Sequence, residues 1–155
     1  MQDAPAQLLV DVARLAPGGE TVEGEADIAD VQEEFVKASG PMRYRLFVQA
    51  FGTEVVARGS LAQDFRFVCS RCGGDFEATV EKSDFSASVE TGERDQFADL
   101  TAEARDSIIL EIPNFPVCGE DCPGTPQVAA GGVPDGRWSA LDALSAPPAE
   151  GKGKI

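Results

Sequence analysis

Apolar and polar residues alternate along the middle of this chain, and this alternation restricts the fold more than any other feature of the sequence. The first run extends from Met42 to Phe51, and a second begins at Glu54 and includes Gly59, which is typical of a bulge or bend. Successive side chains of a strand point to opposite faces, so a period of two indicates strands with one buried and one solvated face.

A third alternating run follows Gly74. Its apolar positions are even from Phe76 to Val80 and odd from Phe85 to Val89. One extra residue in a strand causes such a change of parity, so we expect a β-bulge near residues 82–84. Consecutive alternating runs joined by short turns predict an antiparallel β-sheet meander.

The flanking segments carry weaker signals. Residues 7–12 predict a first strand, residues 20–36 fit a strand, a loop or a short helix, and residues 90–99 resemble a polar loop. One main helix is predicted near residues 100–112, with Thr101 as its cap, Glu103 in its first turn and Pro113 as its end. Its apolar stripe consists of Leu100, Ala104, Ile108, Ile109 and Ile112. The expected fold class is therefore α+β.

The C-terminal part differs in composition from this domain. We expect the α+β domain to span residues 1–122 and a Pro/Gly/Ala-rich linker to span 123–136. Residues 137–144 can form a short amphipathic helix containing Trp138, followed by a disordered tail at 145–155. The sequence leaves open whether Trp138 docks onto the domain or onto a partner.

The charge is strongly acidic but unevenly distributed. The net charge is −14, from 27 acidic and 13 basic residues. Such a surface as a whole repels a phosphate backbone and suits a basic partner such as a ribosomal protein. Residues 37–71 form an exception, which we call the basic island, because there the basic residues outnumber the acidic ones. Its basic residues are Lys37, Arg43, Arg45, Arg58, Arg66 and Arg71.

The chain contains no histidine. This absence excludes nucleophile arrangements that depend on a histidine base, and no glycine-rich phosphate loop is present either. We therefore expect a non-enzymatic protein without a small-molecule substrate. The chain lacks a basic, apolar leader and any apolar run near the roughly 20 residues of a membrane span. A cytoplasmic location without a membrane partner follows as an expectation, with reduced thiols.

Four cysteines form two close pairs. Cys69 and Cys72 stand in a C-x2-C spacing where one strand turns into the next, and Cys118 and Cys122 form a C-x3-C after the helix. Two such pairs supply the four soft ligands that a tetrahedral zinc ion requires, so we predict a two-knuckle zinc clasp. An iron–sulfur cluster, idle reduced thiols and a redox or disulfide role remain alternatives.

Three ordered elements of the chain resemble the YceD family of bacterial proteins. They are Phe67-Val68-Cys69-Ser70-Arg71-Cys72, the stretch from Asp99-Leu100-Thr101 to Cys118 and Cys122, and Pro134-Asp135-Gly136-Arg137-Trp138-Ser139-Ala140-Leu141. The resemblance implies a cytoplasmic factor needed for the accumulation or processing of large-subunit (23S) ribosomal RNA. Its implied partners are the precursor RNA or an early large-subunit assembly particle.

The residues that contact such a partner can be predicted from the strand pattern. Arg43 and Arg45 share a strand face with Phe47 and Phe51, and Arg58 and Arg66 belong to the next run. Arginines beside aromatic rings can pair with and stack on RNA. The predicted partner-binding residues are Arg43, Arg45, Arg58, Arg66, Arg71 and Trp138.

Two alternatives to this interface remain open. Phe47 and Phe51 can instead pack beneath a helix while the arginines pair with nearby carboxylates. The acidic stretch Glu20–Glu34 can bind a basic ribosomal protein without any contact to RNA, or remain solvated.

Overall fold

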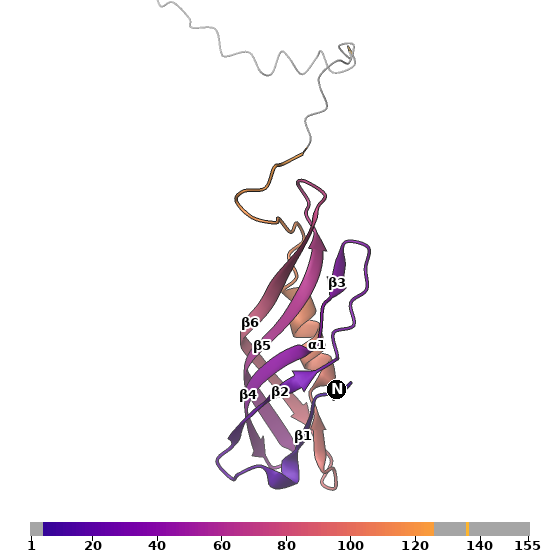
Figure 1. The fold of residues 1–155 in the computed structure, drawn as a ribbon. Helices are drawn as coiled ribbons and strands as arrows, with labels where there is room; N and C mark the ends of the chain where they lie inside the picture. The colour runs from indigo at the N-terminus through magenta and orange to yellow at the C-terminus, as the bar shows by residue number, and fades with distance from the viewer. Residues whose placement is uncertain (1–4, 126–135, 137–155) are drawn as a thin grey trace, which may run out of the picture. The chain divides into compact units, whose positions relative to one another are not determined.

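The computed structural model describes residues 5–125 and Gly136. Most of the described chain is antiparallel β-sheet, and it contains one α-helix (Figure 1). The predicted helix at 137–144, the tail, Trp138 and most of the linker lie outside the described residues. The elements are β1 (Leu9–Asp11), the 3-10 helix η1 (Val12–Arg14), β2 (Glu20–Ala26), β3 (Val36–Ala38), β4 (Met42–Phe51), β5 (Glu54–Val68), β6 (Asp75–Glu90), β7 (Phe97–Asp99) and α1 (Thr101–Leu110).

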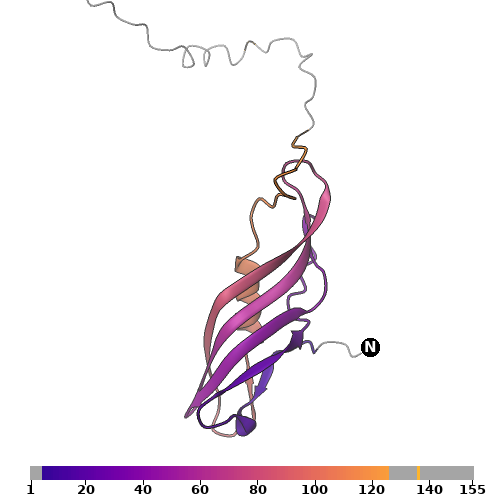
Figure 2. The ribbon, with the colours of Figure 1, turned by 60° about the vertical axis from the view of Figure 1, so that its left-hand side comes forward.

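The main sheet is organised around β5, as Figures 1 and 2 show. One side of β5 pairs with β6 along nearly its whole length. The other side pairs with β4 through residues 54–62 and with β3 through residues 65–67, and β2 continues the sheet beyond β4. The alternating runs at 42–51, 54–68 and 75–90 are thus three long adjacent strands. Where β4 ends, β3 takes its place as the neighbour of β5 on the same side.

The predicted bulge is confirmed, and the structure assigns its extra residue to β6. Gly59 is paired with Phe85, whereas Leu61 is paired with Lys82, so two residues of β6, Ser83 and Asp84, lie opposite one residue of β5, Ser60. The extra residue reverses which side chains face the core, and Val80 and Phe85 are both buried as a result.

The core lies between the inner face of the sheet and α1. Figure 1 shows α1 against one face only of the long strands. The even residues of β4 and the odd residues of β5 point inward, as the alternation predicted. Ala104 and Ile108 are buried, and Ile109 and Ile112 pack against the core, which confirms the predicted stripe. The largest fully buried apolar side chains are Leu8, Met42, Leu46, Val48, Val55, Leu61, Phe65, Phe67, Phe85, Leu100 and Ile108.

The start of α1 differs from its prediction. Thr101 is the first helical residue and not the cap, a position that Leu100 occupies without a side-chain hydrogen bond. The Asp99 carboxylate accepts a hydrogen bond from Thr101 N at 2.9 Å, so it satisfies a free amide in the cap's place. The Thr101 hydroxyl donates to Asp99 and accepts from Leu8 N at 3.0 Å. Thr101 therefore lies one position later in the helix than predicted, and its hydroxyl bonds to the N-terminal segment and to Asp99 instead of capping the helix.

Two short pairings were not predicted. Residues 97–99, expected within a loop, form β7 and pair with β1 through Leu9↔Asp99 and Val10↔Ala98. The ambiguous segment 20–36 begins as β2 and ends at the first residue of β3, whose three residues pair with residues 65–67 of β5. Strands of three residues contain too little alternation to be distinguished from loops, and their partners are distant in sequence.

Candidate metal centre

The first cysteine pair lies in the turn of the β5–β6 hairpin. Cys69 follows the last residue of β5, and its amide donates to Gly74 O at 2.8 Å while its carbonyl accepts from Gly73 N at 3.0 Å. Gly73 has a φ of 73°, a conformation that glycine adopts at little cost. This tight turn directs Cys69 and Cys72 toward the segment that follows α1.

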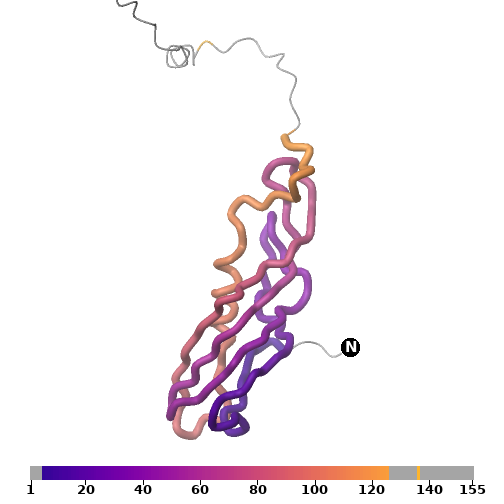
Figure 3. The backbone as a smooth tube through the Cα atoms, turned by 90° about the vertical axis from the view of Figure 1, so that its left-hand side faces the viewer, coloured from indigo at the N-terminus to yellow at the C-terminus, as the bar shows by residue number. Residues whose placement is uncertain are grey.

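The second pair lies in that segment, residues 111–122, which we call the strap. Pro116 O accepts hydrogen bonds from Ser70 N at 2.8 Å and from the Ser70 hydroxyl at 3.0 Å. Two residues further on, Cys118 N donates to Cys69 Sγ at 3.4 Å. These contacts hold the strap against the hairpin turn. Figure 3 shows the strap running beside this turn.

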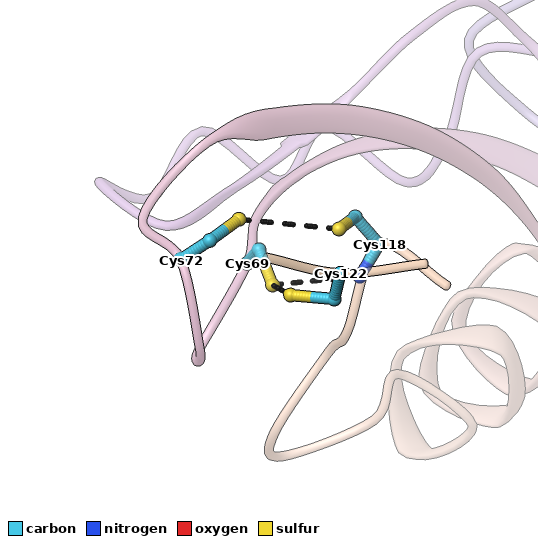
Figure 4. Close-up of side chains that lie close together, drawn as sticks. All are labelled: Cys69, Cys72, Cys118 and Cys122. Atoms are coloured by element: carbon cyan, nitrogen blue, oxygen red, sulfur yellow. Dashed lines mark hydrogen bonds between the residues drawn. The ribbon is translucent and has the colours of Figure 1, made fainter. Parts of the chain in front are cut away.

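The four sulfurs form one cluster (Figure 4). All lie within 4.8 Å of one another, with Cys69 and Cys122 at 3.7 Å and Cys72 and Cys118 at 3.9 Å. A disulfide requires about 2.05 Å, so these are free thiols at ligand spacing. The four cysteines differ in solvent exposure: Cys69 is buried, Cys118 is exposed, and the other two are intermediate. The structure thus brings the predicted ligand set together, and this cluster is able to hold a metal ion.

The surroundings of the cluster favour a thiolate at Cys69. The pKa of Cys69 is lowered to about 6 by the backbone amides of Cys72, Cys118 and Arg71, despite partial desolvation. Neighbouring thiols have the opposite effect at Cys118, where the contact with Cys122 and desolvation raise the pKa to about 12. The Cys72 pKa is also raised, because the Cys69 thiol, burial and Cys122 together outweigh the amide of Gly74. Four thiolates this close together would repel one another, so the free cluster disfavours further deprotonation. A bound cation offsets this repulsion and favours the thiolate form.

The basic island is divided by the fold. Arg43 pairs with Asp64 at 2.8 Å, and Arg45 pairs with Glu23 of β2 at 2.9 Å. The Arg43 hydrogen bond and, after it, that of Thr79 lower the pKa of Asp64 to about 2. The predicted acidic stretch therefore neutralises part of the island within the same molecule.

The remaining arginines of the island lie on β5 and in the hairpin turn. Arg58 lies opposite Phe47 in the sheet, and Arg66 lies opposite Lys37 of β3. Arg71 belongs to the hairpin turn. No carboxylate of the described residues lies within ion-pair distance of Arg58, Arg66 or Arg71. Arg45 and Arg58 line one cleft on the outer face of the sheet, and Trp138 lies outside the described residues.

Phe47 and Phe51 do not pack beneath a helix. They are 45% and 56% exposed, on the sheet face opposite α1, so this part of the alternative is wrong. Its physical reason is parity, because odd residues of β4 point away from the core. The other part of the alternative, the pairing of arginines with carboxylates, holds for Arg43 and Arg45. Phe47 lines a shallow cleft of about 290 Å³ on this outer face together with Thr21, Arg45, Arg58, Gly59, Ser60 and Ser83.

A second surface escaped the sequence analysis. A cleft of about 460 Å³ lies between β6 and the strap, with Phe76 on one side and Phe115 on the other. Phe115 is 81% exposed although it belongs to the cleft lining. The residues of the strap between the helix and Cys118 show no periodicity, so only their apolar content (Phe115, Pro116, Val117) pointed to such a surface.

Searches of protein-family models, of curated proteins and of solved structures found no match to this chain. No helix among the described residues has the length and apolarity that crossing a membrane requires. Fold and site together define a mostly antiparallel α+β protein whose four cysteines can hold a metal ion. The resemblance to the YceD family stays a prediction from sequence motifs.

Proposed function

We propose that this protein is a non-enzymatic, cytoplasmic factor that supports the accumulation or processing of large-subunit ribosomal RNA and carries one structural zinc ion. The observation that carries the proposal is the four-sulfur cluster. It joins the hairpin turn and the strap, which contain two of the three elements that resemble the YceD family. Segments 45 or more residues apart in the chain thus form one unit, as expected of a shared functional element.

The choice of zinc rests on the spacing of the sulfurs. Tetrahedral zinc with Zn–S bonds of about 2.3 Å separates its sulfurs by about 3.8 Å. Two sulfur–sulfur contacts between the pairs, at 3.7 and 3.9 Å, match this value. An iron–sulfur cluster places several irons and sulfides between its thiolates and spreads them further apart. The residues therefore fit a single ion, and Cys69, Cys72, Cys118 and Cys122 would hold it.

Contact with RNA is proposed for the outer face of the sheet. Phe47 offers an exposed ring, and Arg58 lies directly opposite it with no ion pair to a described carboxylate. A ring that stacks on a base beside a guanidinium that binds phosphate is a common arrangement for single-stranded RNA. Arg45 lines the same cleft and can bind a phosphate if its solvent-exposed ion pair with Glu23 breaks.

The proposed RNA contact predicts the effect of three substitutions. An Arg45→Ala/Phe47→Ala/Arg58→Ala variant is expected to bind single-stranded ribosomal RNA at least about tenfold more weakly and with a shallower salt dependence. Fluorescence anisotropy at several salt concentrations measures both quantities. Arg14→Ala/Arg94→Ala removes the same charge from other places and serves as the matched control. An equal loss in both variants would show that general electrostatics, rather than this cleft, determines binding.

The cellular function has a direct test. Depletion of the protein is expected to lower large-subunit ribosomal RNA relative to small-subunit RNA, measured from total RNA. Wild-type protein should restore the ratio, and a Cys72→Ser/Cys118→Ser variant should not. An unchanged ratio after complete depletion contradicts the proposed function.

An acidic adaptor that binds a basic ribosomal or other protein without RNA contact is the second candidate. The ion pairs of Arg43 and Arg45 favour it, because they reduce the positive charge available to phosphate. Such an adaptor would capture a basic protein and show no salt-sensitive RNA binding, so the anisotropy experiment distinguishes the two functions.

A further inference from the structure

One edge of β6 has no strand partner in the described part of the chain. β6 pairs with β5 alone, although it is the longest strand of the sheet, and Figure 2 shows it as the outermost strand. Exposed strand edges invite pairing with another chain, and proteins usually protect them. The only irregularity that the register records along β6 is the bulge opposite Gly59, which leaves the stretch 75–81 regular.

The hydrogen bonds of β5 reveal which groups of β6 face outward. Val68 N donates to Phe35 O at 3.0 Å, and Asp64 O accepts from Ser39 N at 2.8 Å, so even residues of β5 bond away from β6. In an antiparallel pair, their partners on β6 also direct both main-chain groups outward. The register makes Asp75, Glu77, Thr79 and Glu81 these outward-bonding residues.

An apolar cleft lies directly beneath this edge. Phe76, Ala78 and Val80 of β6 contribute one wall, and Phe115 and Val117 of the strap contribute the opposite one. The cleft has a volume of about 460 Å³. A strand added beside β6 would turn alternate side chains toward the inner face, where the cleft lies.

Acidic residues lie along this edge and in the cleft, and we call them the rim. Asp75, Glu77 and Glu81 are exposed residues of β6, and Glu81 and Glu111 contribute to the cleft lining. Lys82 is already engaged, with Asp84 at 3.0 Å and Glu111 at 2.8 Å. Pairing with the β6 edge of a second copy would place like charges together, which disfavours self-association. The charge instead complements lysine or arginine on an incoming chain.

We propose that the edge of β6 at residues 75–81 binds an extended segment of a basic partner protein as an additional strand. The segment alternates apolar residues, which enter the cleft under the strap, with lysine or arginine residues, which face Glu77 and Glu81. Main-chain hydrogen bonds supply affinity in this mode of recognition, and the pockets for alternate side chains supply specificity. This surface is separate from the Phe47 cleft, so the inference goes beyond the proposed RNA contact.

The test measures binding of a fluorescent eight-residue peptide of alternating lysine and valine to the full-length reduced protein by anisotropy. A peptide of the same composition with the lysines and valines in separate blocks is the control. We expect the alternating peptide to bind at least about tenfold more tightly than the block peptide, because only alternation satisfies the cleft and the rim together. Equal affinities would overturn the proposal.

Two variants test the edge itself. Glu77→Pro removes an outward N–H, which an edge strand tolerates, and is expected to weaken binding at least about tenfold with unchanged circular dichroism. Glu77→Lys/Glu81→Lys should weaken it similarly, whereas the matched charge change Glu93→Lys/Glu103→Lys should have little effect. Loss of binding through charge reversal but not through Glu77→Pro would indicate general attraction and overturn strand addition. These peptide measurements do not depend on RNA binding. Strand addition at β6 can therefore be refuted without refuting the proposed RNA contact, and the reverse also holds.

Discussion

A Cys72→Ser/Cys118→Ser variant is expected to lose the proposed zinc ion and at least about 5 kcal/mol of stability, out of roughly 10 kcal/mol that structural zinc can supply. Each cysteine pair loses one of its two ligands, so only two of the four thiolates remain to bind the ion. For a chain of this size the loss corresponds to a fall in melting temperature of about 15 °C or more. Native mass spectrometry of the reduced protein, with and without a chelator, measures the metal, and circular dichroism measures the melting temperature.

Ser70→Ala is the control for this variant. Ser70 lies between the two ligands of the hairpin turn and its hydroxyl bonds to Pro116 O, but it supplies no thiolate. Its substitution should leave the proposed zinc ion bound and cost about 1 kcal/mol of stability. A wild-type protein that is metal-free yet folded, with an unchanged melting temperature in the double variant, would mean that the cysteines are incidental or redox-active.

Gly59→Val is expected to cost about 3 kcal/mol or more, the second-largest effect that we anticipate. A Cβ at this position would lie 2.0 Å from Arg45 O and 2.9 Å from Leu46 Cα. Both are backbone atoms of the neighbouring strand, so β4 and β5 would have to separate at the centre of the sheet. Urea denaturation followed by circular dichroism measures the free energy of unfolding.

Gly18→Ala provides the comparison, because a Cβ on Gly18 would meet no atom within 4 Å. This substitution should change the free energy of unfolding by less than about 0.5 kcal/mol. A loss below about 1 kcal/mol in Gly59→Val would contradict the close approach of the two strands.

The sequence was informative where a pattern repeats within one element. The alternation identified β4, β5 and β6, and the parity change located the bulge to the residues between Lys82 and Phe85. The apolar stripe identified α1. The spacing of the cysteines also predicted the ligand set, because few other arrangements use two close pairs of thiols.

The sequence was uninformative where a property depends on a neighbour from elsewhere in the chain. Arg45 looked available to a phosphate, but β2 places Glu23 beside it. Phe47 looked equally suited to a core or a surface until the position of α1 determined which sheet face is covered. The cleft under the strap required Phe76 and Phe115 to meet, and nothing local to either residue indicates this.

The contact between the N-terminal segment and the start of α1 has a consequence for how the chain folds. Leu8 N bonds to the Thr101 hydroxyl across 93 residues, and Leu100 N donates to Leu8 O at 2.9 Å. Leu8 and Val10 are buried in the core, yet β1 pairs only with β7, close to the end of the described fold. During synthesis β7, the described strand partner of β1, is therefore added only after β2 to β6, and until then β1 lacks this partner. Contacts of such long sequence separation slow folding, so a nascent chain would be most prone to aggregation during that interval.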